Sequence, residues 1–537
     1  MKLTKKWLSL LLAVVMVASV FAGCGNNGDK AANADIASKE ELDPAKIGDY
    51  STLKLPIDDK YTKVTMICNS SVEGQNDSVV IKELRRRTGI NLQLDVIPNA
   101  AFTEKVKVLL AAKDEMQDIF AGLSHEEINE YGMQGAFVPI DDYLDELPNV
   151  KAAYFDSSDE DILNARIFFI AGNGKTYQFP TINTSTVVTH GFMYRKDIFD
   201  KHGIKMWNNK EEFLDALRQL KKLYPDSTPY ASKQKESIFE SLIPQWGIIP
   251  IDGKPMWYDY SAESWKIAYT QPQFKEMLDF MKLMLKEGLL DPEFLTCTQP
   301  AWTTKMTQKD KAFVTFDWMA RADQFKEQTA TTIPEYDLRW ANYISGTTKP
   351  NFTFGGGPAI KNGPNAELAL KLQDYLISPS GAQLLTLGIE GVTYNLDENG
   401  MAKYIGFENG SVEMTELEEK YGLYISPVYR NIDKRSRTFN LPEKQQEPID
   451  KMEGKLMRNN PSVGFFSDEE SALVSKNQIP LKTAAFEFAT KYVLNANSGD
   501  KEWNEWLKKA ETLGASKLCE AYNSAQKRTN EKIKEFK

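Results

Sequence analysis

Cysteine and histidine are scarce in this chain, with four cysteines and three histidines among 537 residues. So few cysteines in so long a chain exclude a disulfide-stabilised scaffold, and those that follow Cys24 form an odd set, at positions 68, 297 and 519. We expect these three thiols to be buried like small apolar side chains. His125, His190 and His202 lack the spacing of zinc ligands, so no metal site is predicted.

The common catalytic signatures are also missing. There is no Gly-x-Ser-x-Gly, no His-Glu-x-x-His and no phosphate-binding loop in the sequence. Adjacent carboxylates such as Asp141 and Asp142 are common on solvated faces. The sequence therefore predicts a protein that is not an enzyme and that needs no cofactor.

Positive charge is in deficit. The 65 lysines and arginines, against 75 aspartates and glutamates, give a formal net charge of -10. An acidic surface argues against nucleic acid as a partner. The content of 42% hydrophobic and 26% charged residues is typical of a globular protein, and the length predicts two or more domains.

Beyond its N-terminus the chain has no apolar run of membrane-spanning length. At the N-terminus, three lysines precede an apolar stretch from Trp7 to Val20, and small residues come just before Cys24. This pattern is typical of a secretory signal, here residues 1–23, because the apolar stretch is shorter than the roughly 20 residues of a transmembrane helix. Phe21-Ala22-Gly23-Cys24 resembles the bacterial lipobox, which implies a lipid on Cys24 and attachment to the extracytoplasmic face of the cell membrane.

Residues 24–54 are mostly small and polar, as in a flexible tether. The body then alternates predicted strands, at 64–68, 92–96 and 118–122, with predicted helices at 79–87 and 102–113. This order indicates an α/β fold with a parallel sheet, whose ligands bind beyond the carboxyl ends of the strands. The loops after the first and third strands therefore supply four candidate ligand-binding residues, Asn69, Asn76, Ser124 and His125.

Several segments together carry a family resemblance. They are KELRRRTG at 82–89, GKTYQFP at 174–180, YRKD at 194–197, EGLLDPEF at 287–294, DYLISPSG at 374–381 and GIEGVTY at 388–394. In this order and spacing they resemble the extracellular solute-binding proteins of family 1, most closely the lipoproteins that serve carbohydrate ABC importers.

The resemblance implies a two-lobed periplasmic-binding-protein-like fold of type II, with a hinge between the lobes and a ligand cleft at their interface. It implies that lobe I comprises residues 55–185 plus 357–430, and lobe II residues 186–356 plus 431–537. The implied function is that of a monomeric binding protein that captures an oligosaccharide and delivers it to the permease of an ABC importer. Many members carry a calcium loop where this chain has residues 224–230, which lack the alternating oxygen ligands and the turn glycine, so no calcium is expected there.

Sugars present apolar C–H faces to aromatic rings and hydroxyl groups to charged or amide side chains. The candidates in polar or glycine-rich surroundings are Trp246, Trp302, Asp317, Trp318, Glu390 and Tyr394. Trp302 is expected in a loop, and Trp318 where a cleft loop begins. Arg195 is a further candidate, although the run Arg-Lys-Asp more often forms a structural salt bridge. For each tryptophan, packing in the core stays open as the alternative.

Three other functions stay open at this point. The aromatic and carboxylate content would also suit a secreted polysaccharide-degrading enzyme. The same fold would suit an adhesin or signalling receptor. The solute of a binding protein could also be something other than a sugar, such as a peptide.

Overall fold

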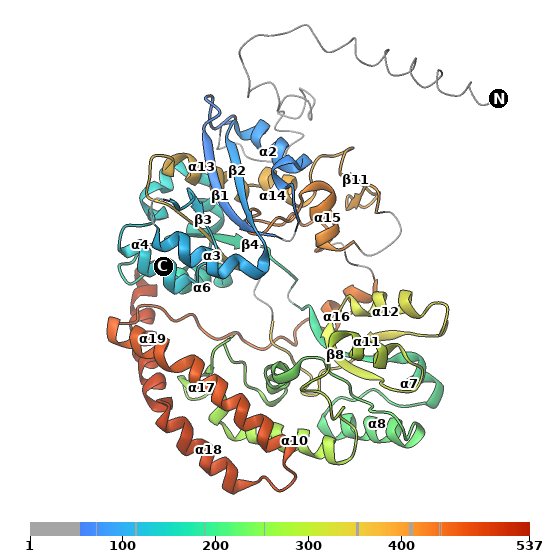
Figure 1. The fold of residues 1–537 in the computed structure, drawn as a ribbon. Coiled ribbons are helices and arrows are strands. Elements are labelled where there is room, and N and C mark those ends of the chain that lie inside the picture. Colours follow the sequence, from blue (N-terminus) through green and yellow to red (C-terminus); the bar gives the residue numbers. More distant parts are fainter. Residues whose placement is uncertain are drawn as a thin grey trace, which may run out of the picture.

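Two lobes, one above the other in Figure 1, make up this computed structural model. It describes residues 54–536 except residues 71, 113–114, 187, 252, 351–353, 408–411, 440 and 442. The predicted signal, Cys24 and all but the last residue of the predicted tether lie outside the described residues. By the packing of their buried side chains, residues 54–182 and 354–439 form lobe I, and residues 188–349 and 441–536 form lobe II.

Lobe I is built on a five-stranded sheet with the strand order β2-β1-β3-β10-β4. Its strands are β1 (Lys63–Asn69), β2 (Asn91–Ile97), β3 (Ile119–Phe120), β4 (Gln178–Ile182) and β10 (Phe354–Ile360). β1 is parallel to β2 and β3, whereas β10 is antiparallel to its neighbours β3 and β4. The predicted parallel sheet is therefore confirmed, with one antiparallel strand that comes from much later in the chain.

The first helix of lobe I shows how local sequence sets these elements. Ser78 caps α2 (Val79–Thr88) by accepting a hydrogen bond from the backbone N–H of Ile81. Gly89 ends the helix at φ 70°, and a Cβ added there would lie 1.9 Å from the carbonyl oxygen of Asp58. Only glycine suits this left-handed position and close approach, so β2 begins just after it, as the sequence predicts.

The remaining lobe I elements cover the sheet. The helices are α3 (Asn99–Ala111), α4 (His125–Met133), α5 (Pro148–Val150), α6 (Glu160–Phe169), α13 (Ala366–Ile377), α14 (Pro379–Thr386) and α15 (Met414–Tyr421). A small hairpin of β11 (Tyr394–Leu396) and β12 (Ala402–Tyr404) lies beyond α14. In Figure 1 the N-terminal blue and cyan elements share lobe I with the orange helices α13 to α15, so this lobe is made from two distant parts of the chain.

Lobe II repeats the strand plan of lobe I in reduced form. Its sheet has the order β8-β5-β9, with β5 (His190–Arg195) antiparallel to β8 (Val314–Trp318) and β9 (Leu338–Trp340). Tyr230 forms parallel bridges with Val314 of β8 and with Leu290. The order Leu290, Tyr230, β8, β5, β9 thus matches β2, β1, β3, β10, β4, including the antiparallel fourth member.

Helices surround the lobe II sheet and form most of its core. They are α7 (Lys196–His202), α8 (Lys210–Leu223), α9 (Ile238–Leu242), α10 (Pro272–Lys286), α11 (Gln299–Thr307), α12 (Arg321–Thr329), α16 (Glu443–Met452), α17 (Asp468–Leu494), α18 (Asp500–Thr512) and α19 (Ala515–Phe536). A hairpin of β6 (Met256–Asp259) and β7 (Ser264–Ile267) packs against α19. Within the described chain, no helix is both long enough and apolar enough to cross a membrane.

The chain crosses from one lobe to the other three times. The crossings lie after β4 and before β5, after β9 and before β10, and after Ile432 and before α16. The segments that lead into the first and third crossings are hydrogen-bonded to each other, because the N–H of Ile182 donates to the carbonyl oxygen of Arg430 at 2.9 Å. The packing extends lobe I to 354–356 and 431–439, whereas the sequence places these residues in lobe II. The hinge between the lobes stays a prediction.

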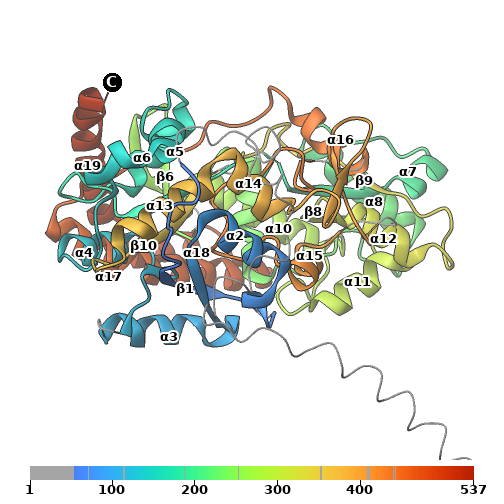
Figure 2. The same ribbon diagram turned by 90° about the horizontal axis from the view of Figure 1, so that it is seen from above.

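The lobes also touch away from these crossings. The Lys254 ammonium of lobe II lies 3.1 Å from Oε1 of Glu126 in α4 of lobe I. Ser462 of lobe II donates a hydrogen bond to the carbonyl oxygen of Asn164 in α6. In Figures 1 and 2 the C-terminal end of α19 lies beside α6, on the same side of the molecule as these contacts.

The predicted burial of the cysteines is largely confirmed. Cys68 and Cys297 are buried and Cys519 is half-buried, and all three are free thiols. Burial raises the pKa of the Cys68 thiol to about 12, so it stays protonated and unreactive at neutral pH.

Candidate functional site

The carboxyl ends of the parallel strands in both lobes lie on the hinge side. In lobe II, Trp318 at the end of β8 pairs with His190, the first residue of β5 after the passage from lobe I. In lobe I, Ile182 at the end of β4 pairs with Phe354 at the start of β10, and β3 runs parallel to β4. The strand ends of the two lobes therefore face the cleft between them, where α/β sheets bind their ligands.

A pocket of about 250 Å³ opens at the strand ends of lobe I. Its lining comprises Ala121, Gly122, Leu123, His125, Phe169, Gln178, Gly356, Gly357 and Pro427. A Cβ added to Gly356 would lie 3.1 Å from the Gln178 amide and 3.2 Å from the Phe169 ring. The pocket thus owes part of its space to missing side chains on β10.

One wall of this pocket is aromatic. The His125 ring lies 4.2 Å from the Phe168 ring and 6.1 Å from the Phe169 ring, measured between centroids. Nδ1 of His125 lies 3.1 Å from Oε2 of Glu126, the residue that Lys254 reaches from lobe II. Burial lowers the pKa of His125 to about 4, and the nearby Lys254 ammonium adds to this effect, so the imidazole is neutral at pH 7.

A buried hydrogen-bond donor without a partner also lines the pocket. Gln178 is buried, and its Nε2 has no hydrogen-bond partner. Behind Gly357 and Pro427, the Arg430 guanidinium donates to Oγ1 of Thr181 at 2.9 Å and to the carbonyl oxygen of Pro427, while its Nε has no partner. Burial lowers the pKa of Arg430 to about 9.

The facing surface of lobe II carries a charged cluster. Asp317 is buried, and its Oδ2 lies 2.8 Å from the Lys233 ammonium, which follows the Tyr230 strand segment. Nε of Arg321, at the start of α12, lies 3.7 Å from Oδ1 of Asp317. Lys233 and Arg321 both lie over the Trp302 ring, at 4.6 and 5.6 Å from its centroid. Two cations thus share one carboxylate at the strand ends of lobe II.

The lobe I residues proposed from sequence have different surroundings. Asn69 ends β1, and Asn76 uses its amide to bond both backbone groups of Leu94. Ser124 caps α4 in a capping box with Glu127. Of the four strand-end candidates in lobe I, His125 is the one that lines the pocket.

Two further candidates lie on the outer part of lobe I. Tyr394 is fully buried, and its hydroxyl accepts a hydrogen bond from Gln383. Glu390 is exposed. Neither of them is among the lining residues of the pocket.

Most of the proposed lobe II aromatics pack in its core. Trp246 is buried against the Phe280 ring, at 5.3 Å between centroids, with the Lys210 ammonium over its face. The expected loop position of Trp302 is wrong, because it lies in α11, is fully buried and donates to Thr315 at 3.0 Å. Trp318 is half-buried at the end of β8, and its place at the cleft stays a prediction.

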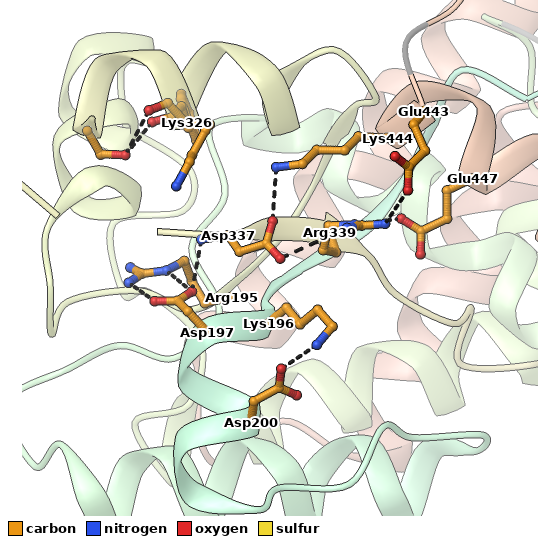
Figure 3. Close-up of polar contacts among 12 residues, drawn as sticks. Arg195, Lys196, Asp197, Asp200, Lys326, Asp337, Arg339, Glu443, Lys444 and Glu447 are labelled. Carbon is orange, nitrogen blue, oxygen red and sulfur yellow. Dashed lines mark hydrogen bonds and ion pairs between the residues drawn. The ribbon is translucent and has the colours of Figure 1, made fainter. Parts of the chain in front are cut away.

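Arg195 forms the structural salt bridge that the sequence allowed as its alternative. Its Nε and Nη2 donate to the two carboxylate oxygens of Asp197 at 2.8 and 2.6 Å (Figure 3). It lies at the end of β5 that is remote from His190, within a network in which Lys444 of α16 pairs with Asp337 at 2.9 Å. This network fastens α16 to the edge strand β9, since Arg339 of β9 also pairs with Glu447.

Several residues of the site were missed from sequence. They are Phe169, Gln178, Lys233, Arg321, Gly356, Gly357, Pro427 and Arg430. The run Gly355-Gly356-Gly357 is a signal that could have pointed to a place where bulk is excluded. Nothing local marks Gln178 or Arg430, because their burial arises from contacts between distant segments.

No group of three or more histidine, cysteine, aspartate or glutamate side chains suited to a metal ion occurs in the described part of the chain. At residues 224–230, where the sequence predicts no calcium loop, the carbonyl oxygen of Ser227 accepts a hydrogen bond from the Lys221 ammonium at 2.7 Å. The hydroxyl of Ser227 donates to the carbonyl oxygen of Tyr224.

Comparison with models of protein families shows which family the chain belongs to. The family model described as "Bacterial extracellular solute-binding protein" matches residues 70–383, more than half of the chain. The chain belongs to this family. The resemblance found in the sequence is therefore confirmed, and no curated protein sequence matches the chain.

Solved structures show the same fold. The alginate-binding protein AlgQ2 without calcium ion is 21% identical, with a TM-score of 0.70 over 87% of this chain and 98% of that chain. An extracellular solute-binding protein from Bifidobacterium longum subsp. infantis is 15% identical, with a TM-score of 0.71 over 87% and 98%. The Streptococcus pneumoniae ABC-transporter substrate-binding protein FusA in complex with kestose is 19% identical, with a TM-score of 0.68 over 88% and 100%. The predicted two-lobed type II fold is confirmed.

Proposed function

We propose that this solute-binding protein captures an oligosaccharide in the cleft between its lobes and delivers it to the permease of an ABC importer. The observation that carries the proposal is the pocket at the strand ends of lobe I, which combines an aromatic wall with amide and imidazole groups. Rings suit the C–H faces of a sugar, and amide and imidazole groups suit its hydroxyls. Structural neighbours named for alginate, kestose and fructo-nystose support a carbohydrate ligand.

Capture would follow from hinge closure. A ligand that contacts the lobe I pocket and the Trp318 end of β8 together binds the closed form better than the open form, and so shifts the population toward closure. A micromolar affinity corresponds to about -8 kcal/mol, which a few stacked rings and hydrogen bonds supply. No covalent chemistry is required, which agrees with a family of binding proteins for transport.

In this proposal the mature protein is a monomer that begins at a lipid-modified Cys24 and is held at the extracytoplasmic face of the membrane. The sequence pattern of residues 1–24 supports this part. Mass spectrometry of the protein from its native membrane tests it. We expect an N-terminal peptide that begins at an acylated Cys24. A protein that still carries residues 1–23 would contradict this part of the proposal.

The ligand is tested by isothermal calorimetry and thermal shift against a panel of oligosaccharides and peptides, with reducing-end release measured in the same samples. Binding of at least one oligosaccharide without its cleavage is expected. Binding to peptides alone would overturn the carbohydrate assignment. Release of reducing ends would instead favour a polysaccharide-degrading enzyme.

A further inference from the structure

The lobe I pocket has an unusual balance of charge for a sugar site. None of its lining residues in the described chain is acidic, and the carboxylate next to it, Glu126, is paired with Lys254. The polar groups on the lining are the Gln178 amide and the neutral His125 ring. The pocket thus offers donors to a ligand and no negative charge.

The Arg430 guanidinium lies directly behind this lining. A Cβ added to Gly357 would come within 1.8 Å of its Nη1, so the guanidinium lies against the backbone that forms the pocket wall. Arg430 is 2% exposed and has no carboxylate partner among the described residues; its bonds go to a hydroxyl and a carbonyl oxygen. A buried cation without a counter-charge is costly to fold, because it gives up its hydration without a compensating anion.

A lining residue of the pocket and Arg430 each carry an unpartnered donor. Nε2 of Gln178, which is 3% exposed and lines the pocket, has no hydrogen-bond partner. Nε of Arg430 is likewise unpartnered. Buried donors in native proteins nearly always have partners, so the unpartnered Nε2 of Gln178 in the pocket lining indicates that an acceptor occupies the pocket in the working state.

We propose that the lobe I pocket binds a carboxylate-bearing sugar unit, so that the solute is an acidic oligosaccharide of the uronic acid class. The carboxylate would accept a hydrogen bond from the Gln178 amide, and the positive charge of Arg430 behind the pocket wall would stabilise it without direct contact. The surplus of cations on the facing surface, where Lys233 and Arg321 share Asp317, suits the same ligand. This inference rests on the proposed function and narrows its substrate class.

The first experiment compares pools of acidic oligosaccharides with the same pools after their carboxyl groups have been reduced to hydroxymethyl groups. Calorimetry on the full-length protein should show binding that weakens about 10- to 100-fold on reduction, the range for losing a charge-assisted hydrogen bond. Equal binding of both forms, or binding of neutral glycans alone, overturns the inference and leaves the proposed function intact. Binding of no glycan in either form overturns the proposed function itself.

Substitution separates this role from a structural one. Gln178→Glu places a negative charge on the pocket wall and should weaken the acidic ligand at least about 10-fold, with a smaller effect on its reduced counterpart. Gln308→Glu, which makes the same charge change on the exposed surface of lobe II, should leave both affinities unchanged. Thermal unfolding of Gln178→Glu and Gln308→Glu checks that each variant is folded. In a second pair of variants, Arg430→Lys, which retains the charge, should bind the acidic ligand more tightly than Arg430→Met. A Gln178→Glu variant that loses acidic and reduced ligands equally would contradict the inference.

Discussion

Three consecutive glycines on β10 provide a sharp test of the pocket geometry. A Cβ added to Gly355 meets nothing within 4 Å, and one added to Gly356 meets the Gln178 amide at 3.1 Å. A Cβ added to Gly357 meets Nη1 of Arg430 at 1.8 Å and the carbonyl oxygen of Phe179 at 2.7 Å. None of the three has a positive φ, so alanine is compatible with the backbone and contact alone decides the outcome.

The expected effects of alanine differ along the strand. Gly355→Ala should raise the free energy of unfolding by about 0.5 kcal/mol, because alanine restricts the unfolded chain. Gly357→Ala should lower it by about 1–3 kcal/mol, the usual cost of overpacking, since the Phe179 carbonyl belongs to the paired strand β4 and cannot rotate away. Gly356→Ala should change stability little but reduce ligand affinity, because the methyl group takes space between Gln178 and Phe169.

Thermal unfolding followed by circular dichroism measures the stabilities. At about 2–4 °C per kcal/mol, Gly357→Ala should unfold about 2–12 °C below the unsubstituted protein. Calorimetry with the best ligand of the panel measures affinity, with Gly355→Ala as the matched control. The reasoning would be refuted if Gly357→Ala were as stable as Gly355→Ala, or if Gly355→Ala and Gly356→Ala bound the ligand equally well.

Two further predictions concern charged groups of the cleft. Burial lowers the pKa of His125 to about 4, whereas in the unfolded chain it is about 6.5. Between these pH values the unfolded chain binds a proton that the folded protein does not. The contribution of His125 to the free energy of unfolding is therefore lost as pH falls from about 6.5 toward 4. His125→Gln should therefore show a smaller drop in unfolding temperature between pH 7.5 and pH 5 than the unsubstituted protein, and an equal drop would contradict this. Lys233→Met leaves buried Asp317 with only the more distant Arg321 and should cost about 1–3 kcal/mol in urea unfolding, whereas Lys509→Met, on an exposed pair, should cost almost nothing. Adding Asp317→Asn should recover part of the loss, and a double variant no more stable than Lys233→Met would show that the ion pair is not the cause.

The elements of lobe I were accessible to sequence reasoning because their signals are local. The caps Ser78 and Gly89 delimit α2, and the alternation of Leu92 and Leu94 marks β2. The strand-end rule then led to His125, which lines the pocket. The same rule applied to lobe II would have led to Lys233, but the Tyr230 segment forms only isolated bridges and leaves a weak strand pattern.

Trp302 shows where local reasoning fails. Pro300, two residues before it, favours a loop when taken alone, but Thr298 caps α11 and places Pro300 in its first turn, where proline is tolerated. The helix then carries Trp302 under Lys233 and Arg321, which belong to other segments. Whether an aromatic ring in this chain packs in the core or lies at the cleft depends on such distant neighbours.

By itself, the sequence determined the α/β elements of lobe I and their strand ends, because caps and periodicity act over short stretches of chain. The order of its motifs indicated the family, and the two-lobed fold followed from that resemblance. Only the tertiary structure decided that Arg430 is buried without a counter-charge behind Gly357, and that Gln178, Phe169 and His125 meet in one pocket. The reason is that burial and charge balance are sums over all segments packed around a side chain, and these segments come from separate parts of the sequence, as Thr181 and Arg430 show.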